Sequence, residues 1–178
     1  MLLPTPQQLK AINIRPETLK DIRAIENITI AAFAGKPYSD ETEHLVINAL
    51  RDAGALALSL VAEMDGIVVG HIAFSVVTIN EKDKGWYGLG PVSVLPEVQK
   101  QGTGSKLIRE GLSLIRKRGA KGCVVEGSPA YYQRFGFKTY PGLFYEDTPA
   151  PEYFMALPFY KEVPDGRVEF HKAFYLKT

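Results

Sequence analysis

Two apolar, β-branched runs constrain the fold more than any other feature of the chain. They cover residues 58–63 and 67–79, and the short turn between them contains Asp65-Gly66. An Asp-Gly pair is a strong hairpin signal, because both residues adopt the left-handed backbone conformations of a type I′ turn. We therefore expect a hairpin of two antiparallel strands, the second of them long.

Weaker patterns on either side of the hairpin predict the other elements. Strands are expected at residues 12–15, 86–95, 122–126, 154–157 and 168–171. Helices are expected from the capping-box-like Thr18-x-x-Asp21 to Ile28, at residues 45–50, at 102–118 and at 131–135. A charged turn at residues 81–85 should precede the fourth strand, which Pro91 interrupts because proline cannot donate to the ladder.

The chain is long and apolar enough to enclose one core. Its 178 residues are 46% apolar, which suffices without disulfides, a metal or a second domain. We expect a single domain over residues 1–178, with its core at about 12–158 and a C-terminal strand and tail at 159–178. The formal net charge is +1, so no global field favours nucleic acid or an anionic membrane as a partner.

The sequence also favours a cytoplasmic location. Cys123 is the single cysteine and cannot form an intramolecular disulfide, and its apolar neighbours favour a buried thiol over a reactive one. No stretch approaches the roughly 18 apolar residues of a membrane span. Residues 1–14 lack the charged start and long apolar run of a signal peptide.

A strand, a glycine loop and an amphipathic helix follow one another between residues 91 and 118. The loop reads Gln99-x-x-Gly102-x-Gly104. The first amides of a helix lack internal partners, and glycines let a ligand approach the backbone, so this unit can hold a phosphate. It lacks the third glycine of a dinucleotide fingerprint, and the chain has no Walker motif. Taken alone, the loop fits equally well a turn whose glycines serve only backbone freedom.

Two motifs in order resemble the GCN5-related N-acetyltransferase (GNAT) family. The family pattern Gln/Arg-x-x-Gly-x-Gly/Ala matches residues 99–104, and Tyr-x-x-x-Gly-Phe matches residues 132–137. Residues 91–96 and 151–158 resemble the YhbS-like subgroup of predicted acetyltransferases, and the likeness begins at about Ile12. The resemblance implies an α/β (α+β) fold with a mixed, mostly antiparallel twisted sheet of six to seven strands, about four helices, and a cofactor cleft between strands four and five.

The same resemblance implies acetyl-CoA as the cosubstrate and no metal. Pantetheine would pair with the backbone of Val92 and Val94, and the pyrophosphate would meet the amides of residues 100–105. The implied cosubstrate-binding residues are Val92, Ser93, Val94, Gln99, Lys100, Gln101, Gly102, Thr103, Gly104, Ser105, Tyr132 and Phe135. By family analogy Tyr132 stabilises the departing thiolate; the less favoured alternative is a core tyrosine packed on Phe135 and Phe137.

Acetyl transfer needs a neutral amine and a donor to the oxyanion. An amine with a pKa of about 10.4 is only about one part in 10³ neutral at pH 7, so a group or a water chain must remove a proton. No general base stands out: Glu126 is the nearest candidate in sequence, but a solvated glutamate at the end of a strand is the favoured reading, and a strand histidine such as His71 more often satisfies a local hydrogen bond. The Val94 amide is the candidate oxyanion donor.

We therefore expect an N-acetyltransferase that moves acetyl from acetyl-CoA directly to a primary amine, without an acyl-enzyme. The acceptor is a small molecule or a protein, recognised by residues 33–38 and by C-terminal loops such as Tyr145-Glu146-Asp147. The chain is expected to act as a monomer or homodimer. The alternatives are a non-catalytic acyl-CoA sensor or interaction module, and a nucleotide-binding protein, which the missing Walker residues disfavour.

Overall fold

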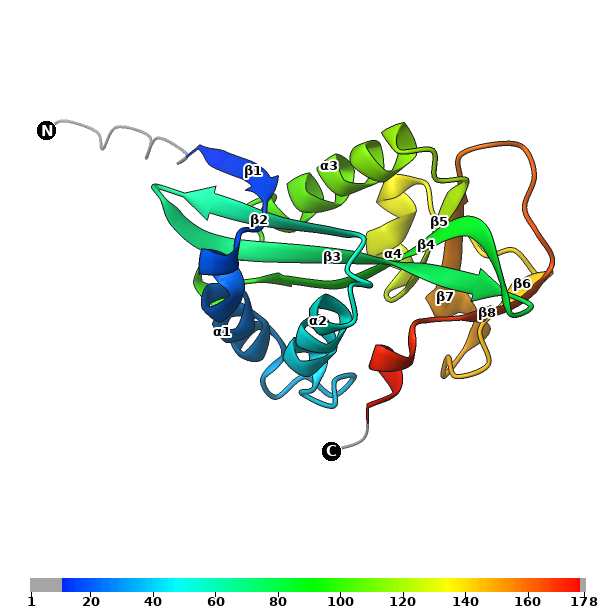
Figure 1. The fold of residues 1–178 in the computed structure, drawn as a ribbon, viewed down its shortest axis with the longest axis horizontal. Coiled ribbons are helices and arrows are strands. Elements are labelled where there is room, and N and C mark those ends of the chain that lie inside the picture. Colours follow the sequence, from blue (N-terminus) through cyan, green and yellow to red (C-terminus); the bar gives the residue numbers. More distant parts are fainter. Residues whose placement is uncertain (1–10, 177–178) are drawn as a thin grey trace, which may run out of the picture.

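A computed structural model describes residues 11–176, which form one eight-stranded sheet with helices on both faces (Figure 1). The path of paired strands is β1 (Ile12–Pro16), β2 (Leu58–Met64), β3 (Ile67–Ile79), β4 (Lys82–Val94), β5 (Gly122–Glu126) and β7 (Phe154–Pro158). Two shorter strands, β6 (Leu143–Phe144) and β8 (Gly166–Glu169), extend the sheet beside the end of β3. The helices are α1 (Ile22–Phe33), α2 (Glu43–Asp52), α3 (Thr103–Lys117) and α4 (Pro129–Tyr132).

The sheet is mixed and mostly antiparallel, which confirms the expected fold class. The parallel pairs among the described strands are β4 with β5 and β6 with β8. The expected hairpin of β2 and β3 is present, and β3 pairs along its length with β2, β4 and β8. The two-residue strand β6 was not expected, because a run so short carries no alternation for a sequence pattern to detect.

The two faces of the sheet are covered by different helices (Figure 1). Phe74 of β3 points toward α3 and packs so closely that a Cβ on Gly111 would lie 2.4 Å from its ring. On the opposite face, Val61 of β2 packs against Ile25 of α1 and Ile47 of α2. Successive strand residues point to opposite faces, so a single long strand such as β3 supplies side chains to both layers.

The charged segment before the fourth strand differs from the expectation. Residues 81–85 were predicted as a turn, whereas β4 begins at Lys82 and pairs at once with Ile79. Asn80 and Glu81 have φ values of 50° and 64°, so these two residues alone reverse the chain, as in a type I′ turn. The charges of residues 82–84 lie on exposed positions of the strand instead of in a loop.

An ion-pair network fixes the start of α1 against the sheet. The Thr18 N–H donates to Asp21 Oδ2 at 2.7 Å, as the capping-box pattern predicted, and Arg15 donates to both Asp21 carboxylate oxygens at 2.7 and 2.9 Å. Arg15 also bonds Glu63 of β2 at 2.7 Å. The Arg15 guanidinium holds the pKa of the buried Asp21 carboxyl well below its usual range.

A buried histidine lies in the layer between β3 and α1. His71 is fully buried, and its Nε2 lies 2.7 Å from Ser59 Oγ, whereas Nδ1 has no hydrogen-bond partner among residues 11–176. Burial lowers the pKa of His71 from 6.5 to about 4, while Glu17 raises it by a smaller amount and Arg51 lowers it further. The sequence reading of His71 as a residue with a local hydrogen bond agrees with this geometry.

His71 should make folding sensitive to acid. The native state keeps the imidazole neutral while the unfolded chain binds a proton below pH 6.5, so stability is lost as the pH falls from 6.5 toward 4. One pKa unit corresponds to about 1.36 kcal/mol, so the His71 contribution amounts to about 3 kcal/mol. Urea unfolding of the wild type and of His71→Gln at several pH values measures it. Parallel stability curves for the two proteins would contradict this assignment.

Candidate functional site

The central feature of the site is the point where β4 and β5 separate. The two strands pair only over Trp86–Gly88 and Gly122–Val124. Beyond these residues β4 stays paired with β3, with a bulge opposite Ile72 and Phe74, whereas β5 stays paired with β7. The separation coincides with Pro91, which cannot donate to a neighbouring strand. The second half of β4 therefore has no ladder partner on its β5 side.

The backbone of Val94 faces this gap. Val94 lies opposite Gly70, and the next residue, Leu95, donates its N–H to Val69 O at 2.9 Å. In an antiparallel ladder this pattern directs the N–H and C=O of Val94 itself away from β3. The Val94 carbonyl accepts a bond from Gln99 Nε2 at 2.9 Å. Gln99 thus ties the following loop to the end of β4.

The loop between β4 and α3 contains two residues in the left-handed backbone conformation. Lys100 has a φ of 63°, and Gly102, the N-cap of α3, has a φ of 86°. The Gly102 carbonyl accepts from Lys106 N–H, so the amides of the first turn have no partner within the helix. Thr103 is 1% exposed, and its hydroxyl has no hydrogen-bond partner among residues 11–176. The loop therefore ends in several unused donors.

Glycine suits position 104 for two reasons. It leaves the backbone of the first turn of α3 open to a ligand, and a neighbouring side chain leaves little room for a Cβ. A Cβ at Gly104 would lie 3.0 Å from the hydroxyl of Tyr131, which the segment with α4 brings over the first turn of α3. The sequence singled out Gly104 but not Tyr131, because nothing in the local pattern indicates that α4 packs against this turn. The doubled tyrosine at residues 131 and 132 was the one available signal.

Tyr132 is a buried phenol at the end of α4. It is 8% exposed, and its ring packs edge-on against Tyr131 and Phe137, with Phe135 at a tilted angle. A Cβ on Gly127 would lie 2.5 Å from the Tyr132 ring. Burial raises the pKa of Tyr132 above its usual range, and Tyr131, Cys123 and Tyr38 add to the effect. Tyr132 is therefore a neutral hydrogen-bond donor throughout the physiological pH range.

Tyr38, in the segment between α1 and α2, is near enough to make a small contribution to the raised pKa of Tyr132. Glu126, at the end of β5, is exposed to solvent, and partial desolvation and then the nearby Asp147 carboxylate raise its pKa. Burial and a hydrogen bond with Tyr175 raise the pKa of Tyr145. The Asp147 and Glu126 carboxylates raise it further by smaller amounts. Carboxylates and phenols therefore gather beyond the carboxyl end of β5.

Other predicted residues have internal partners. The Ser93 hydroxyl lies 3.3 Å from Thr29 Oγ1 of α1 and is buried, so this side chain points into the helix layer. Phe135 lies beneath the guanidinium of Arg109, 4.9 Å from its ring centroid. Cys123 is buried, and burial raises the pKa of its thiol, as the sequence reading of an unreactive cysteine requires.

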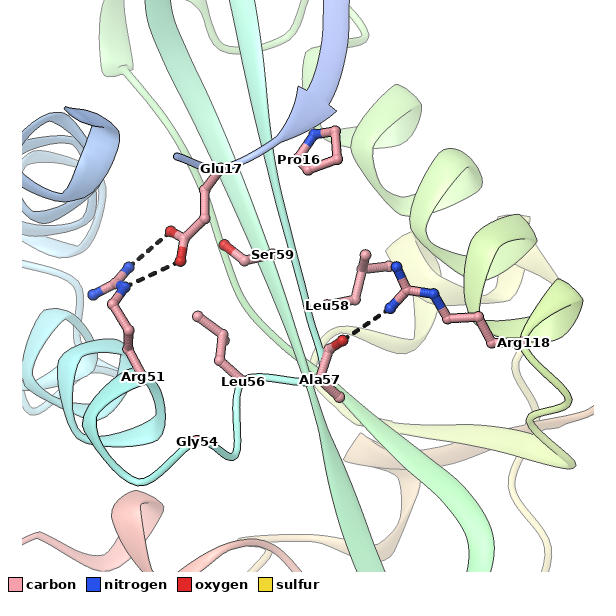
Figure 2. Close-up of a pocket in the computed structure, with 9 residues that line it drawn as sticks. All are labelled: Pro16, Glu17, Arg51, Gly54, Leu56, Ala57, Leu58, Ser59 and Arg118. Carbon is pink, nitrogen blue, oxygen red and sulfur yellow. Dashed lines mark hydrogen bonds and ion pairs between the residues drawn. The ribbon is translucent and has the colours of Figure 1, made fainter. Parts of the chain in front are cut away.

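Two cavities are lined by residues outside the β4–β5 gap and the loop before α3, and the second of them includes the Tyr145-Glu146-Asp147 loop that the sequence predicted to recognise the acceptor. One of about 310 Å³ opens where β1 leaves the edge of β2, between the Glu17–Arg51 ion pair and Arg118 (Figure 2). The other, of about 200 Å³, is lined by Tyr145, Glu146, Asp147, Arg167, Val168, Glu169 and Tyr175. Neither is lined by a residue that the sequence predicted to bind acetyl-CoA.

Within residues 11–176, no group of three or more His, Cys, Asp or Glu side chains is arranged to hold a metal ion. None of the helices formed by these residues is long and apolar enough to cross a membrane.

Comparison with known proteins identifies the class. The sequence model described as the acetyltransferase (GNAT) domain matches residues 56–139. A GNAT family acetyltransferase from Brucella melitensis, solved in complex with acetyl-CoA, is 50% identical, with a TM-score of 0.83 over 93% of this chain and 99% of that one. The chain belongs to the GNAT family.

Two Escherichia coli proteins are related as well. The uncharacterized N-acetyltransferase YhbS of strain K12 is 36% identical over 110 residues, which cover 61% of this chain, and the uncharacterized N-acetyltransferase YjhQ is 39% identical over 125 residues, or 68% of it. The matched segments span 66% and 65% of these relatives, just under two thirds of each. A YhbS structure from Escherichia coli in complex with CoA is 29% identical and has a TM-score of 0.83 over 98% of this chain and 97% of that one.

The contact between Gly127 and Tyr132 can be tested without substrate. Gly127→Ala should force the Tyr132 ring to move and destabilise the fold by about 1–3 kcal/mol through overpacking. Denaturant unfolding measures the loss. When the ring is already removed by Tyr132→Leu, adding Gly127→Ala should cost little more. An additive double mutant would show that the two residues do not clash.

Proposed function

We propose that this chain is an N-acetyltransferase that transfers the acetyl group of acetyl-CoA directly to a primary amine. One observation carries the proposal: the outward-facing backbone of Val94 lies next to a loop that ends in the unpartnered amides of α3. The relatives solved with acetyl-CoA and with CoA, at 50% and 29% identity, support the same cosubstrate for this chain.

Acetyl-CoA fits the hydrogen-bonding groups at this junction. The amides of residues 100–105 would bind the pyrophosphate, since a helix N-terminus and a bent loop favour anions. The buried hydroxyl of Thr103 is an unused donor at the same turn. Pantetheine amides would pair with the backbone of Val92 and Val94, which β5 leaves unpaired. When bound, acetyl-CoA supplies an activated thioester carbonyl.

Two groups of the chain would stabilise developing charge. The Val94 N–H would donate to the oxyanion, because it faces the gap and lies on a rigid strand. Tyr132 would donate a hydrogen bond to the thiolate. A phenol with a pKa of about 10 is already a weaker acid than a thiol at about 8.5, and burial raises the Tyr132 pKa further. We therefore assign to Tyr132 a hydrogen bond and not a complete proton transfer.

Glu126 is the proposed base for the acceptor amine. Its raised pKa, caused by desolvation and by Asp147, makes it a better proton acceptor than an ordinary glutamate. Glu126 ends β5, and Gly127, the next residue, contacts Tyr132. The base and the proposed thiolate donor are therefore carried by adjacent segments of chain.

The acceptor is proposed to be a small molecule or a protein that enters between residues 33–38 and the C-terminal loops. The effect of Tyr38 on Tyr132 supports the first region. A single transferase domain acting as a monomer or homodimer in the cytoplasm is part of the same proposal. The buried free thiol of Cys123 is compatible with a reducing compartment.

Tyr132→Phe should separate binding from chemistry. The variant should bind acetyl-CoA as the wild type does but release thiol about 10²-fold more slowly with an accepted amine, because the thiolate loses its hydrogen bond. Calorimetry measures binding, and a thiol-release assay over a panel of amines measures turnover, with mass spectrometry of the product to identify the acceptor.

Two results would overturn parts of this proposal. If the wild type binds no acetyl-CoA at millimolar concentration, the cosubstrate assignment is wrong. If it binds acetyl-CoA but releases no thiol with any amine, the chain is a non-catalytic acyl-CoA sensor or interaction module. Full activity of Tyr132→Phe would remove only the role assigned to that residue.

The pH dependence of turnover tests Glu126. As a base, Glu126 must be deprotonated, so kcat/KM should fall as the pH drops through its pKa, which lies above the ordinary carboxyl value of 4.5. Glu126→Gln should lower kcat/KM and remove this limb of the profile. Asp147→Asn should move the limb to lower pH, because Asp147 raises the Glu126 pKa. An unchanged profile in Glu126→Gln would assign the base elsewhere.

A further inference from the structure

Arg134 is an exposed cation that the protein holds in one place. Its Nε donates to Tyr131 O at 3.2 Å and its Nη2 to Ser105 Oγ at 3.4 Å. The guanidinium also lies 4.5 Å from the centroid of the Tyr131 ring and 5.4 Å from that of Phe135. Among residues 11–176, no carboxylate forms an ion pair with it. The guanidinium therefore has two hydrogen bonds and two ring contacts but no anionic partner within the described part of the chain.

The position of this guanidinium is electrostatically unfavourable in the absence of an anion. Ser105 lies in the first turn of α3, where the helix dipole is positive and repels cations. The same turn contains Thr103, whose hydroxyl is buried and has no partner among the described residues. Lys106 is directed elsewhere and donates to the Ile12 carbonyl. A ligand with negative charge and several acceptor oxygens would resolve the repulsion and the unused hydroxyl together.

We propose that Arg134 and the first turn of α3 together clamp a phosphate group of the cosubstrate. The inference rests on the proposed function and adds a side chain to a site otherwise built from backbone amides. A guanidinium suits this role because its planar set of donors matches phosphate oxygens, and stacking on Tyr131 leaves its N–H edge free to donate. The phosphate is the pyrophosphate or the 3′-phosphate of CoA.

The clamp also connects the cosubstrate to the catalytic phenol. Arg134 lies two residues beyond Tyr132, the last residue of α4, in a 3-10 turn whose aromatic rings pack on one another and on α4. A phosphate bound by Arg134 therefore restrains the segment that carries Tyr132. Binding energy from a part of the substrate that does not react would in this way help to hold the thiolate donor in position.

Calorimetry with three probes tests the proposal on the full chain: acetyl-CoA, its 3′-dephospho form, and S-acetylpantetheine, which has neither the pyrophosphate nor the nucleotide. Arg134→Gln should weaken acetyl-CoA about 10- to 100-fold, as expected for a charged hydrogen-bonded pair. S-acetylpantetheine should bind the variant and the wild type equally. Dephospho-CoA identifies the phosphate: an undiminished effect of the mutation assigns the pyrophosphate, and a lost effect assigns the 3′-phosphate.

Arg109→Gln is the matched control. Arg109 also stacks on Phe135, at 4.9 Å, but comes from the second turn of α3 and has no hydrogen bond to Ser105. Its loss should leave the affinity for all three probes unchanged, and Arg134→Lys should recover part of the acetyl-CoA affinity. Far-UV circular dichroism and thermal unfolding confirm that each variant is folded.

The outcomes separate this inference from the proposed function. Unchanged acetyl-CoA affinity in Arg134→Gln, or an equal loss for acetyl-CoA and S-acetylpantetheine, would overturn the clamp, because neither depends on a phosphate. An equal loss in Arg109→Gln would do the same. A wild-type protein that binds none of the probes would overturn the proposed cosubstrate itself, whatever the variants do.

Discussion

The separation of β4 from β5 is the constraint on which the rest of the structure depends. Parallel strands normally continue side by side, because each unmade backbone hydrogen bond in a buried site costs about 1–3 kcal/mol. Here pairing ends after Gly88, and Trp86 packs so tightly at the last shared stretch that a Cβ on Gly122 would lie 2.4 Å from its ring. Beyond that point β4 stays paired with β3 on both sides of a bulge. The gap leaves backbone N–H and C=O groups of β4 without a partner on the β5 side, and a ligand with amides can form hydrogen bonds with them.

The site that follows from this gap is assembled by packing between distant segments. The loop and α3 come directly after β4, whereas Tyr131 and Tyr132 come after β5. Contact between Tyr131 and Gly104, and between Arg134 and Ser105, joins the two segments. Both contacts join residues that are distant in sequence, so the geometry depends on how β4 and β5 place the two segments.

Because the site forms between segments that are distant in sequence, only its local features could be predicted from the sequence. Local signals identified the hairpin at Asp65-Gly66, the glycine loop before α3 and the family tyrosine Tyr132, because each depends on a turn preference or a short motif. Tyr131 and Arg134 were missed since their significance comes from a partner about 27 or 29 residues away in sequence. The early start of β4 was missed for another reason: charged residues 82–84 suggested a turn, but cross-strand pairing with β3 overrides that propensity.

A net charge of +1 conceals two local fields of opposite sign. The first turn of α3 is positive and adjoins Arg134, whereas Glu126 and Asp147 place negative charge beyond the end of β5. Carboxylates attract an ammonium acceptor, but they also stabilise its protonated form and so oppose the deprotonation that attack requires. The conflict is reduced if one carboxylate takes the proton. Desolvation first and then repulsion by Asp147 raise the Glu126 pKa, and both effects suit its proposed role as the base, because protonating Glu126 relieves them while it neutralises the amine.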